Sequence, residues 1–415
     1  MVDALLNYVN GIPVIDAHEH LVEGPADLDF SRLLTNYVVD DLVAAGCPPD
    51  AMVSLTDARR PVAERWATIE PYFNAIRFGG YAQMALRTAR GLFGVADINA
   101  STVEILSEKI RDLHSSGAYQ KVLREKCGIK ALIQCWCMDV PGPEYFYHLA
   151  PGPEVVNLSS RGALEGLEKK SARRIRALED IEEAMEIMVA RWVGTPRVVG
   201  VKLAHAYARP IRIRRRTRAE AEEVLRRVAQ AASAALSVEE CIPLEDYLVF
   251  KLAGLLEAKG FPLVIHTGLQ AGYRGRIADS HPLGLQALLE SFPELKVDLF
   301  HGGMPWVREI GVLARHFPGV HLNMAWMHII CPAQARSALS EWLDSVPLTK
   351  IFGFGGDVNN CELVYGHLEL ARLNIARVLA EKVAEGTMSE EEARAVAHAM
   401  IFENPNRFYK LGLKR

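Results

Sequence analysis

Residues 261–303 decide the fold of this chain, and they read FPLVIHTGLQAGYRGRIADSHPLGLQALLESFPELKVDLFHGG. Short apolar runs at 262–266 and 296–301 predict two buried strands, each of which ends in a histidine. The helical pattern HPLGLQALLESF lies between them, so we expect the two strands to run parallel with a helix crossing over. The stretch therefore indicates an α/β fold built from repeated strand and helix units.

The same alternation continues on both sides of this stretch. Strand-like runs are expected at 12–16, 130–136, 154–158, 198–203, 262–266, 296–301, 320–323 and 350–354, with helical patterns between most of them. Eight parallel strands are the number that closes a (β/α)8 TIM-type barrel. A doubly wound open sheet is the competing fold, but no Gly-x-Gly-x-x-Gly motif follows an early strand.

Residues 33–127 interrupt the alternation with helical patterns alone, such as AERWATIEPYFNAI and STVEILSEKIRDLHSSGAYQKVLREKC. We therefore predict two units. Residues 1–32 and 128–415 form the barrel, and residues 33–127 form a mostly helical insertion after the first strand. Two further helical patterns, at 361–386 and 389–405, follow the last predicted strand.

Composition limits the class of partner. The chain has 415 residues, of which 50% are hydrophobic and 24% charged, and its net charge is −4, so it supplies no overall attraction for nucleic acid or an anionic membrane. We expect the chain to bind a small-molecule substrate and neither nucleic acid nor a membrane. Assembly into a homo-oligomer is compatible with the composition. The first residues lack a signal-peptide pattern and the seven cysteines are scattered, which favours reduced thiols in the cytoplasm. Cys135 and Cys137 form half of a metal motif at most, and we interpret them as core thiols.

Four histidines and an aspartate stand at the ends of predicted strands. His18 and His20 follow the first strand, His266 and His301 end two later strands, and Asp357 follows the last one. In a closed barrel the carboxyl ends of all strands face one mouth, so these side chains are expected in one pocket. Histidines two residues apart in extended chain point the same way and can chelate one ion. Nitrogen and oxygen donors suit Zn, and also Mn, Fe or Co, so we predict one or two divalent cations per chain.

The motifs IDAHEHL, VIHTG, LFHGGMP and FGFGGD, with ENPNRFYKL further on, resemble the amidohydrolase superfamily in its amidohydrolase-related branch of metal-dependent hydrolases. The resemblance implies a distorted eight-stranded barrel with a metal at its mouth. By motif position it implies that His18, His20 and His266 are metal ligands, that Asp357 is ligand and general base, and that His301 contacts the substrate or a second metal. The helical insertion also resembles that of uronate isomerases, a branch of the superfamily that does no hydrolysis.

Several further residues are candidates for the same mouth. Lys202 stands near the end of the strand at 198–203, and three roles stay open: a carboxylated bridge between two metals, as in binuclear members of the superfamily, a contact with substrate or a ligand carboxylate, or a structural ion pair. The Arg-rich loop YARPIRIRRRTR offers Arg209 for a carboxylate of the substrate, with solvated surface as the plainer interpretation. Further candidates for substrate contact are His205, Arg274 and Trp326.

These expectations favour a metal-dependent hydrolase that attacks an amide, lactone or ester-like bond. A divalent metal lowers the pKa of water to about 7 at best, and Asp357 is placed to take a proton while His301 stabilises an oxyanion. The alternative is isomerisation of the uronate isomerase kind, or nonoxidative decarboxylation, on the same barrel. A metal-stabilised binding module without turnover is a third possibility.

Overall fold

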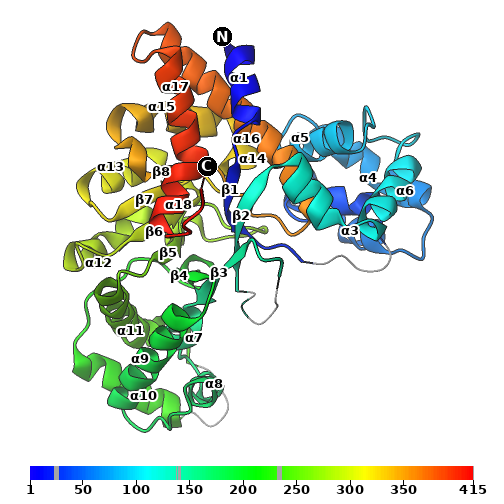
Figure 1. The fold of residues 1–415 in the computed structure, drawn as a ribbon. Coiled ribbons are helices and arrows are strands. Elements are labelled where there is room, and N and C mark those ends of the chain that lie inside the picture. Colours follow the sequence, from blue (N-terminus) through cyan, green and yellow to red (C-terminus); the bar gives the residue numbers. More distant parts are fainter. Residues whose placement is uncertain (23–27, 137, 139–141, 231–235, 415) are drawn as a thin grey trace.

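Eight parallel strands lie side by side in the order of the sequence in a computed structural model that describes residues 1–22, 28–136, 138, 142–230 and 236–414 (Figure 1). Each strand pairs with the next one along the chain, as a (β/α)8 barrel requires. The strands are β1 (Val14–Glu19), β2 (Ile129–Cys135), β3 (Phe146–Pro151), β4 (Val198–Leu203), β5 (Leu263–His266), β6 (Val297–Phe300), β7 (Val320–Asn323) and β8 (Ile351–Phe352).

The sheet closes on itself through the segment that follows β8. The backbone N–H of Ala17 donates to the carbonyl of Phe354 at 3.2 Å, and that of Asp357 donates to the carbonyl of His18 at 2.8 Å. Residues 354–357 therefore take the place of a longer eighth strand beside β1. The predicted TIM-type barrel is confirmed.

Two strands differ from their predicted positions. β1 extends to Glu19, so His18 lies within the strand and not after it. The third strand, predicted at 154–158, is wrong. β3 occupies Phe146–Pro151, and residues 154–156 belong to the short helix α7 (Pro153–Val156). Aromatic residues at the start of β3 favour extended chain, whereas Pro153 occupies the first turn of a helix, where its missing N–H costs nothing.

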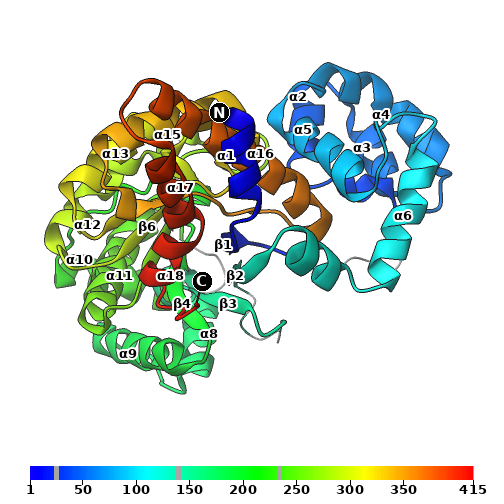
Figure 2. The ribbon, with the colours of Figure 1, turned by 45° about the horizontal axis from the view of Figure 1, so that its top comes forward.

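Helices cover the outside of the barrel, and most of them cross from one strand to the next. Those between α7 and β8 are α8 (Arg161–Ser171), α9 (Leu178–Gly194), α10 (Arg218–Gln230), α11 (Val238–Lys259), α12 (Gln286–Ser291), α13 (Val307–His316), α14 (Met327–Ile330) and α15 (Pro332–Ser345). Those at the two ends of the chain are α1 (Val2–Asn10), α16 (Cys361–Ala384), α17 (Glu390–His398) and α18 (Asn404–Phe408). Figure 2 shows α1 beside α16 and α17, against which it packs.

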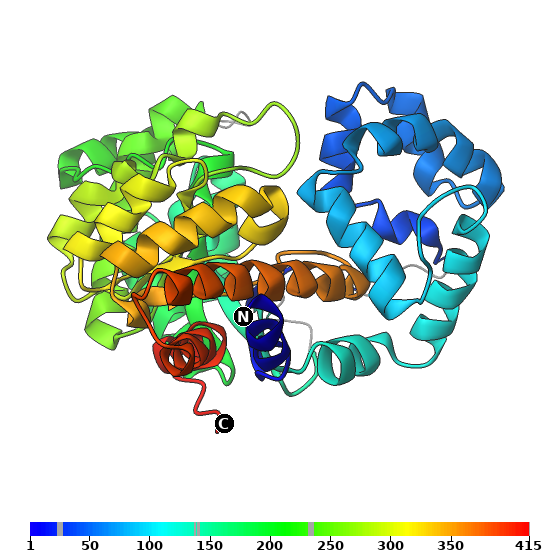
Figure 3. The same cartoon turned by 90° about the horizontal axis from the view of Figure 1, so that it is seen from above.

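Every regular element between β1 and β2 in the described residues is helical. The elements are the 3₁₀ turn η1 (Phe30–Leu33), α2 (Val38–Ala44), α3 (Pro49–Thr56), α4 (Val62–Ile76), α5 (Gly80–Arg87), η2 (Thr88–Leu92), α6 (Val103–Ser115) and η3 (Gln120–Lys126). Seen from above, these helices stand beside the barrel, and α16 runs from the barrel towards them and packs against α5 (Figure 3). The all-helical character expected for 33–127 is present, and the division of the chain into two domains stays a prediction.

The helical elements between β1 and β2, together called the helical segment, are held against α16 by a buried charge cluster. The guanidinium of Arg32 donates to both carboxylate oxygens of Glu362, at 2.7 and 3.1 Å, and the ring of His114 lies 2.6 Å from the same carboxylate. Glu362 is fully buried. A bidentate pair that excludes water fixes orientation as well as distance, so the segment is held against the barrel in a defined position.

The barrel interior is filled by side chains of alternate strand residues and closed from below by α18 and the residue after it. The interior cluster consists of Ile133, Leu149, Val199, Val264, Phe300, Phe352, Phe408 and Tyr409. The hydroxyl of Tyr409 donates to the buried carboxylate of Asp298 at 2.5 Å, and the amide of Asn323 donates to the same oxygen at 2.9 Å. The opposite end of the interior is the mouth described below.

Across the described part of the chain, none of the helices combines the length and the apolar character that crossing a bilayer requires.

Candidate active site

The two histidines of β1 converge on the carboxylate that follows β8. The Nε2 atoms of His18 and His20 lie 3.1 and 3.4 Å from Oδ1 of Asp357, and their rings meet edge to face with centroids 4.7 Å apart. Alternate residues of a strand face the same side, which is why the i, i+2 spacing presents both rings to one point. His18 is buried, and the side chain of His20 is 34% exposed, so His20 borders the open mouth.

Asp357 is positioned by hydrogen bonds to its neighbours on both sides. The N–H of Gly356 donates to Asp16 at 3.0 Å, and the N–H of Val358 donates to Glu19 at 2.8 Å. A Cβ on Gly356 would lie 1.8 Å from Oε1 of Glu19, so only glycine allows this approach. The buried carboxyls of β1 thus clamp the segment that carries Asp357.

His301 and His266 line the other side of the mouth. Nδ1 of His301 lies 3.6 Å from Oδ2 of Asp357, while its Nε2 lies 3.0 Å from Nδ1 of His266. Nε2 of His266 faces the carbonyl of Leu269 at 2.8 Å. Candidate ligand atoms of His18, His301 and Asp357 all lie within 4.8 Å of one another, and His266 is outside that group. The metal role of His266 stays a prediction.

Non-glycine residues in the left-handed backbone region gather at the same strand ends. They are Trp136 after β2, His301 after β6, Trp326 after β7 and Asp357 after β8, with φ between 55° and 68°. Such conformations cost about 1–3 kcal/mol each and persist only where the surrounding structure enforces them. At the mouth, the left-handed backbone of these residues sets the directions in which their side chains point.

Burial sets the protonation states of the site. It lowers the pKa of His18, His266 and His301 well below the ordinary value, helped by the nearby charge of Lys202. These rings are therefore neutral at pH 7, the form that coordinates metals. Burial raises the pKa of Asp357 to about 6, against the opposing charge of Lys202, so its carboxylate is mostly ionised at neutral pH.

Lys202 lies deep in the mouth without a described hydrogen-bond acceptor. Its side chain is buried, its Nζ stands 3.6 Å from the centroid of the Phe300 ring, and among the described residues no acceptor lies within hydrogen-bonding distance. Burial lowers its pKa to about 8. A simple structural ion pair is not what the described contacts show, and the other two roles foreseen for Lys202 stay predictions.

A pocket of about 600 Å³ opens over these groups and draws part of its wall from the helical segment. Tyr37 lines this pocket together with Asp357 and is stacked on Trp326 with ring centroids 4.3 Å apart. The carboxylate of Asp40 accepts from the N–H of Gly272 in the loop after β5 at 2.9 Å. Other lining residues that sequence reasoning missed are Asn36, Trp136, Asn157, Tyr207 and Asn359. No sequence signal marked them: Asn36 reaches the pocket only through the docking of the helical segment, and the other four lie in connections that follow strands and carry no motif.

Arg209 does not reach this pocket. Its side chain is 1% exposed and pairs with Glu245, at 3.1 Å, and with Asp246, both on α11. The carboxylate of Asp246 also accepts from the backbone N–H of Arg214 and the guanidinium of Arg216, both at 3.2 Å. The Arg-rich loop is thereby pinned to α11. The structure thus corrects the placement expected for Arg209 at the substrate.

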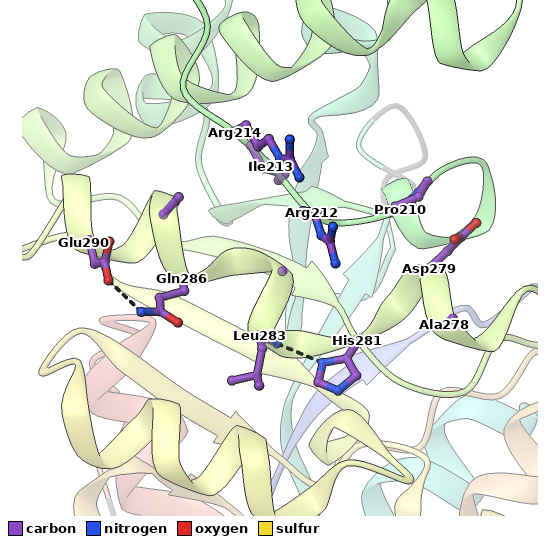
Figure 4. Close-up of a pocket in the computed structure, with 12 residues that line it drawn as sticks. Pro210, Arg212, Ile213, Arg214, Ala278, Asp279, His281, Leu283, Gln286 and Glu290 are labelled. Atoms are coloured by element: carbon purple, nitrogen blue, oxygen red, sulfur yellow. Dashed lines mark hydrogen bonds between the residues drawn. The ribbon is translucent and has the colours of Figure 1, made fainter.

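The exposed arginines of that loop border a different hollow. Arg212 and Arg214 line a cavity of about 740 Å³ between residues 210–214 and 278–290, with His281 and Asp279 on its other wall (Figure 4). None of the candidate metal ligands is among its lining residues.

The remaining substrate candidates are also displaced from the pocket. His205 is 1% exposed, neither ring nitrogen has a described partner, and burial lowers its pKa to about 3. Arg274 lines a separate hollow together with Tyr273. Trp326 is buried behind Tyr37 and meets the His301 ring edge to face at 5.3 Å, so it supports pocket residues and does not form the wall.

The donor set fits a divalent metal. His18, His20 and Asp357 bring two neutral imidazoles and a carboxylate to one point, and Nδ1 of the buried His18 has no described hydrogen-bond partner. Such N and O donors are those of catalytic transition-metal sites. Buried, neutral histidines around an acid are costly unless something compensates them, which is what a bound cation does.

Comparison with known proteins agrees with this geometry. The family model described as amidohydrolase matches residues 172–411. Uronate isomerase of Xanthomonas oryzae pv. oryzae is 27% identical over 173 residues, which are 40% of this chain and 37% of that protein. Protein fluG of Emericella nidulans is 28% identical over 243 residues, 56% of this chain and 28% of that protein. The matched stretch is thus less than two fifths of either relative's length.

Solved structures extend the likeness to the whole fold, including the helical segment. Glucuronate isomerase from Caulobacter crescentus superimposes with a TM-score of 0.80 at 17% identity, covering 100% of this chain and 94% of that one. A putative metal-dependent hydrolase from Lactobacillus casei gives 0.65 at 18% identity, covering 98% of each. At these identities the superpositions establish the fold alone. Because the family model covers more than half of the chain, and the barrel and the histidines at its mouth accord with it, the chain belongs to the amidohydrolase family.

Proposed function

We propose that this protein is a metal-dependent isomerase that moves a proton between adjacent carbons of a small hydroxy-carbonyl compound of the uronate type. Curated relatives named uronate isomerase, and the full-length likeness to a glucuronate isomerase structure, support this reaction over hydrolysis. The proposal replaces hydrolysis, which the motifs alone favoured, as the leading hypothesis.

The observation that carries the proposal is that Tyr37 and Asp357 line the same pocket at the barrel mouth. Isomerisation of a hydroxy-carbonyl compound needs a proton taken from one carbon and returned to its neighbour, and another moved between oxygens. Asp357, Tyr37 and Lys202 are three proton-carrying groups around one pocket, whereas hydrolysis needs one base for water. The helical segment supplies Tyr37, which gives that segment a chemical purpose.

The residues of the chain divide the work as follows. His18, His20 and Asp357 would hold the divalent metal, for which we propose zinc, and the metal would act as a Lewis acid on the substrate oxygens. Asp357, whose pKa burial raises to about 6, accepts the carbon-bound proton. Burial raises the pKa of Tyr37 well above its usual range, so its hydroxyl stays protonated. It can orient the substrate by donating a hydrogen bond to it.

The pocket also narrows how an acidic substrate would be held. Its described lining contains no arginine, and Lys202 is the ammonium group among the lining residues. A cation with a pKa near 8 is charged for most of the time at neutral pH and can meet a carboxylate or a developing oxyanion. We therefore propose that Lys202, and not Arg209, meets the negative part of the substrate.

Hydrolysis of an amide, lactone or ester-like bond is the second candidate. The family match and the placement of Asp357 as a base support it. Nonoxidative decarboxylation of a carboxylic acid is a variant of the first candidate, since it uses the same metal and a proton donor.

One assay separates the candidates. Purified, zinc-loaded protein is incubated in deuterated water with glucuronate and galacturonate, and in parallel with their lactones and with simple amides. Isomerisation predicts ketose formation with deuterium at the carbon next to the carbonyl, and Tyr37→Phe should reduce the rate by about 10²–10⁴ with metal content unchanged. Tyr81→Phe, which alters a neighbouring ring stacked on Tyr37, serves as the matched control. Acid release from lactones or amides without ketose formation would refute the proposal and establish the second candidate.

A further inference from the structure

Cys135 stands at the carboxyl end of β2 and faces the interior of the barrel. Ile133, two residues before it, belongs to the interior cluster, whereas the side chain of Gln134 bonds outward to the backbone of Leu21 at 2.7 and 3.2 Å. Alternate strand residues share a side, so the thiol of Cys135 points inward at the level of the mouth. Its side chain is buried, with 2% exposure.

The sulfur lies among the histidines of β1. Candidate ligand atoms of His18, His20 and Cys135 all lie within 4.8 Å of one another. His18 also belongs to the group that contains His301 and Asp357, so the two groups surround one region of the mouth. Zn–S bonds of about 2.3 Å and Zn–N bonds of about 2.0–2.1 Å bring sulfur and imidazole donors to this kind of separation.

The neighbourhood of the thiol suits an anionic sulfur. Lys202 is close enough to Cys135 for their charges to interact, and its buried Nζ has no described hydrogen-bond acceptor. A cysteine held only for packing does not need a buried ammonium group beside it. A metal-bound thiolate, in contrast, gains from the charge of Lys202.

We propose that Cys135 is a thiolate ligand of the divalent metal that His18 and His20 hold. Binding replaces the S–H bond with a sulfur–metal bond, and the proton is released to solvent. The proposal deepens the proposed function and rests on its metal dependence. It also predicts metal choice, because sulfur favours zinc or cobalt over magnesium or manganese. The interpretation of Cys135 as a simple core thiol would then be wrong.

The test uses metal-free full-length protein loaded with Co²⁺, whose absorption reports its ligands. Wild-type protein should show a thiolate-to-cobalt charge-transfer band in the near ultraviolet. Cys135→Ser should lose that band but keep the weak visible bands of bound cobalt, because the histidines and Asp357 remain. Zinc affinity of this variant should fall by at least about tenfold, since even the loss of a residue that supports a metal ligand costs that much. Cys241→Ser, a change at another fully buried thiol on α11, should leave both bands intact.

The possible failures are distinguishable. Visible cobalt bands without the charge-transfer band, or a band that survives in Cys135→Ser, would overturn the role of Cys135 while leaving metal dependence intact. Absence of every cobalt band would instead refute the metal dependence on which the proposed function rests. X-ray absorption at the zinc edge of the wild-type protein counts sulfur neighbours directly, so the proposal stays testable if the variant folds poorly.

Discussion

Replacing Arg209 with methionine should destabilise the fold and leave recognition of substrate charge unchanged. Methionine fills part of the space but leaves the carboxylates of Glu245 and Asp246 buried, 6% and 0% exposed, without their main partner. Breaking a buried charge cluster by removing one partner costs about 3–5 kcal/mol. We expect the free energy of unfolding to fall by an amount near the lower end of this range, because Arg216 still contacts Asp246.

The measurement is urea unfolding followed by tryptophan fluorescence, together with KM values for an acidic substrate and a neutral analogue. Arg212→Met, a change at an exposed arginine of the same loop, is the control and should shift stability by less than about 0.5 kcal/mol. Replacing Glu245 and Asp246 by their amides in the Arg209→Met background should recover stability, since no unpaired carboxylates remain. Unfolding energy equal to the wild type, with a KM raised for the acidic substrate alone, would show that Arg209 reaches substrate and refute this reasoning.

Three further predictions follow from the mouth and the floor of the barrel. Replacing both His18 and His20 by alanine should abolish binding of the divalent metal, and elemental analysis that finds full occupancy would count against the site. Asp357→Asn should reduce turnover by about 10²–10⁴ and remove the fall in rate expected as pH drops through about 6, the pKa that burial gives this carboxyl; wild-type turnover in the variant would place the base elsewhere. Burial raises the pKa of Asp298 from 3.8 to about 7, against the hydrogen bonds from Tyr409 and Asn323. The folded state therefore holds this proton more tightly, and stability of about 4 kcal/mol, fully present below pH 4, is lost as pH rises to 7. Asp298→Asn should flatten that part of the stability profile, and an unchanged slope in urea titrations between pH 4 and 7 would contradict the assignment.

The sequence contained enough to predict the barrel and to bring its histidines together. His18 lies next to the last residue of β1, His266 ends β5 and His301 directly follows β6, and strand ends of a closed barrel share one mouth whatever the details of the loops. That inference needs only periodicity and chain order. It is also robust to the error in the third strand, because shifting β3 by a few residues leaves the count at eight.

Side-chain partners across long sequence separations were beyond such reasoning. Arg209 follows β4 closely enough to suggest the pocket, but its partners lie 36 and 37 residues further on, in a helix whose docking no local pattern specifies. Tyr37 was missed for the same reason, since it reaches the pocket that contains Asp357 only because the helical segment docks beside the barrel. His266 and His301 both line the pocket at the mouth, yet which of them would face a bound metal depends on ring orientation, and spacing along the chain carries no information about that.

The closure of the sheet has a consequence for how a nascent chain matures. β1 receives its final neighbour only from residues 354–357, which leave the ribosome more than 300 residues after it. Until then, the side of β1 that faces away from β2 is an unpaired edge, and such edges can associate with other chains. Loop closure over so many residues is entropically costly and slow, which makes sealing of the ring a late event. Because His18 lies on one side of that seam and Asp357 on the other, binding of the proposed metal would join the two sides and complete the ring after translation ends.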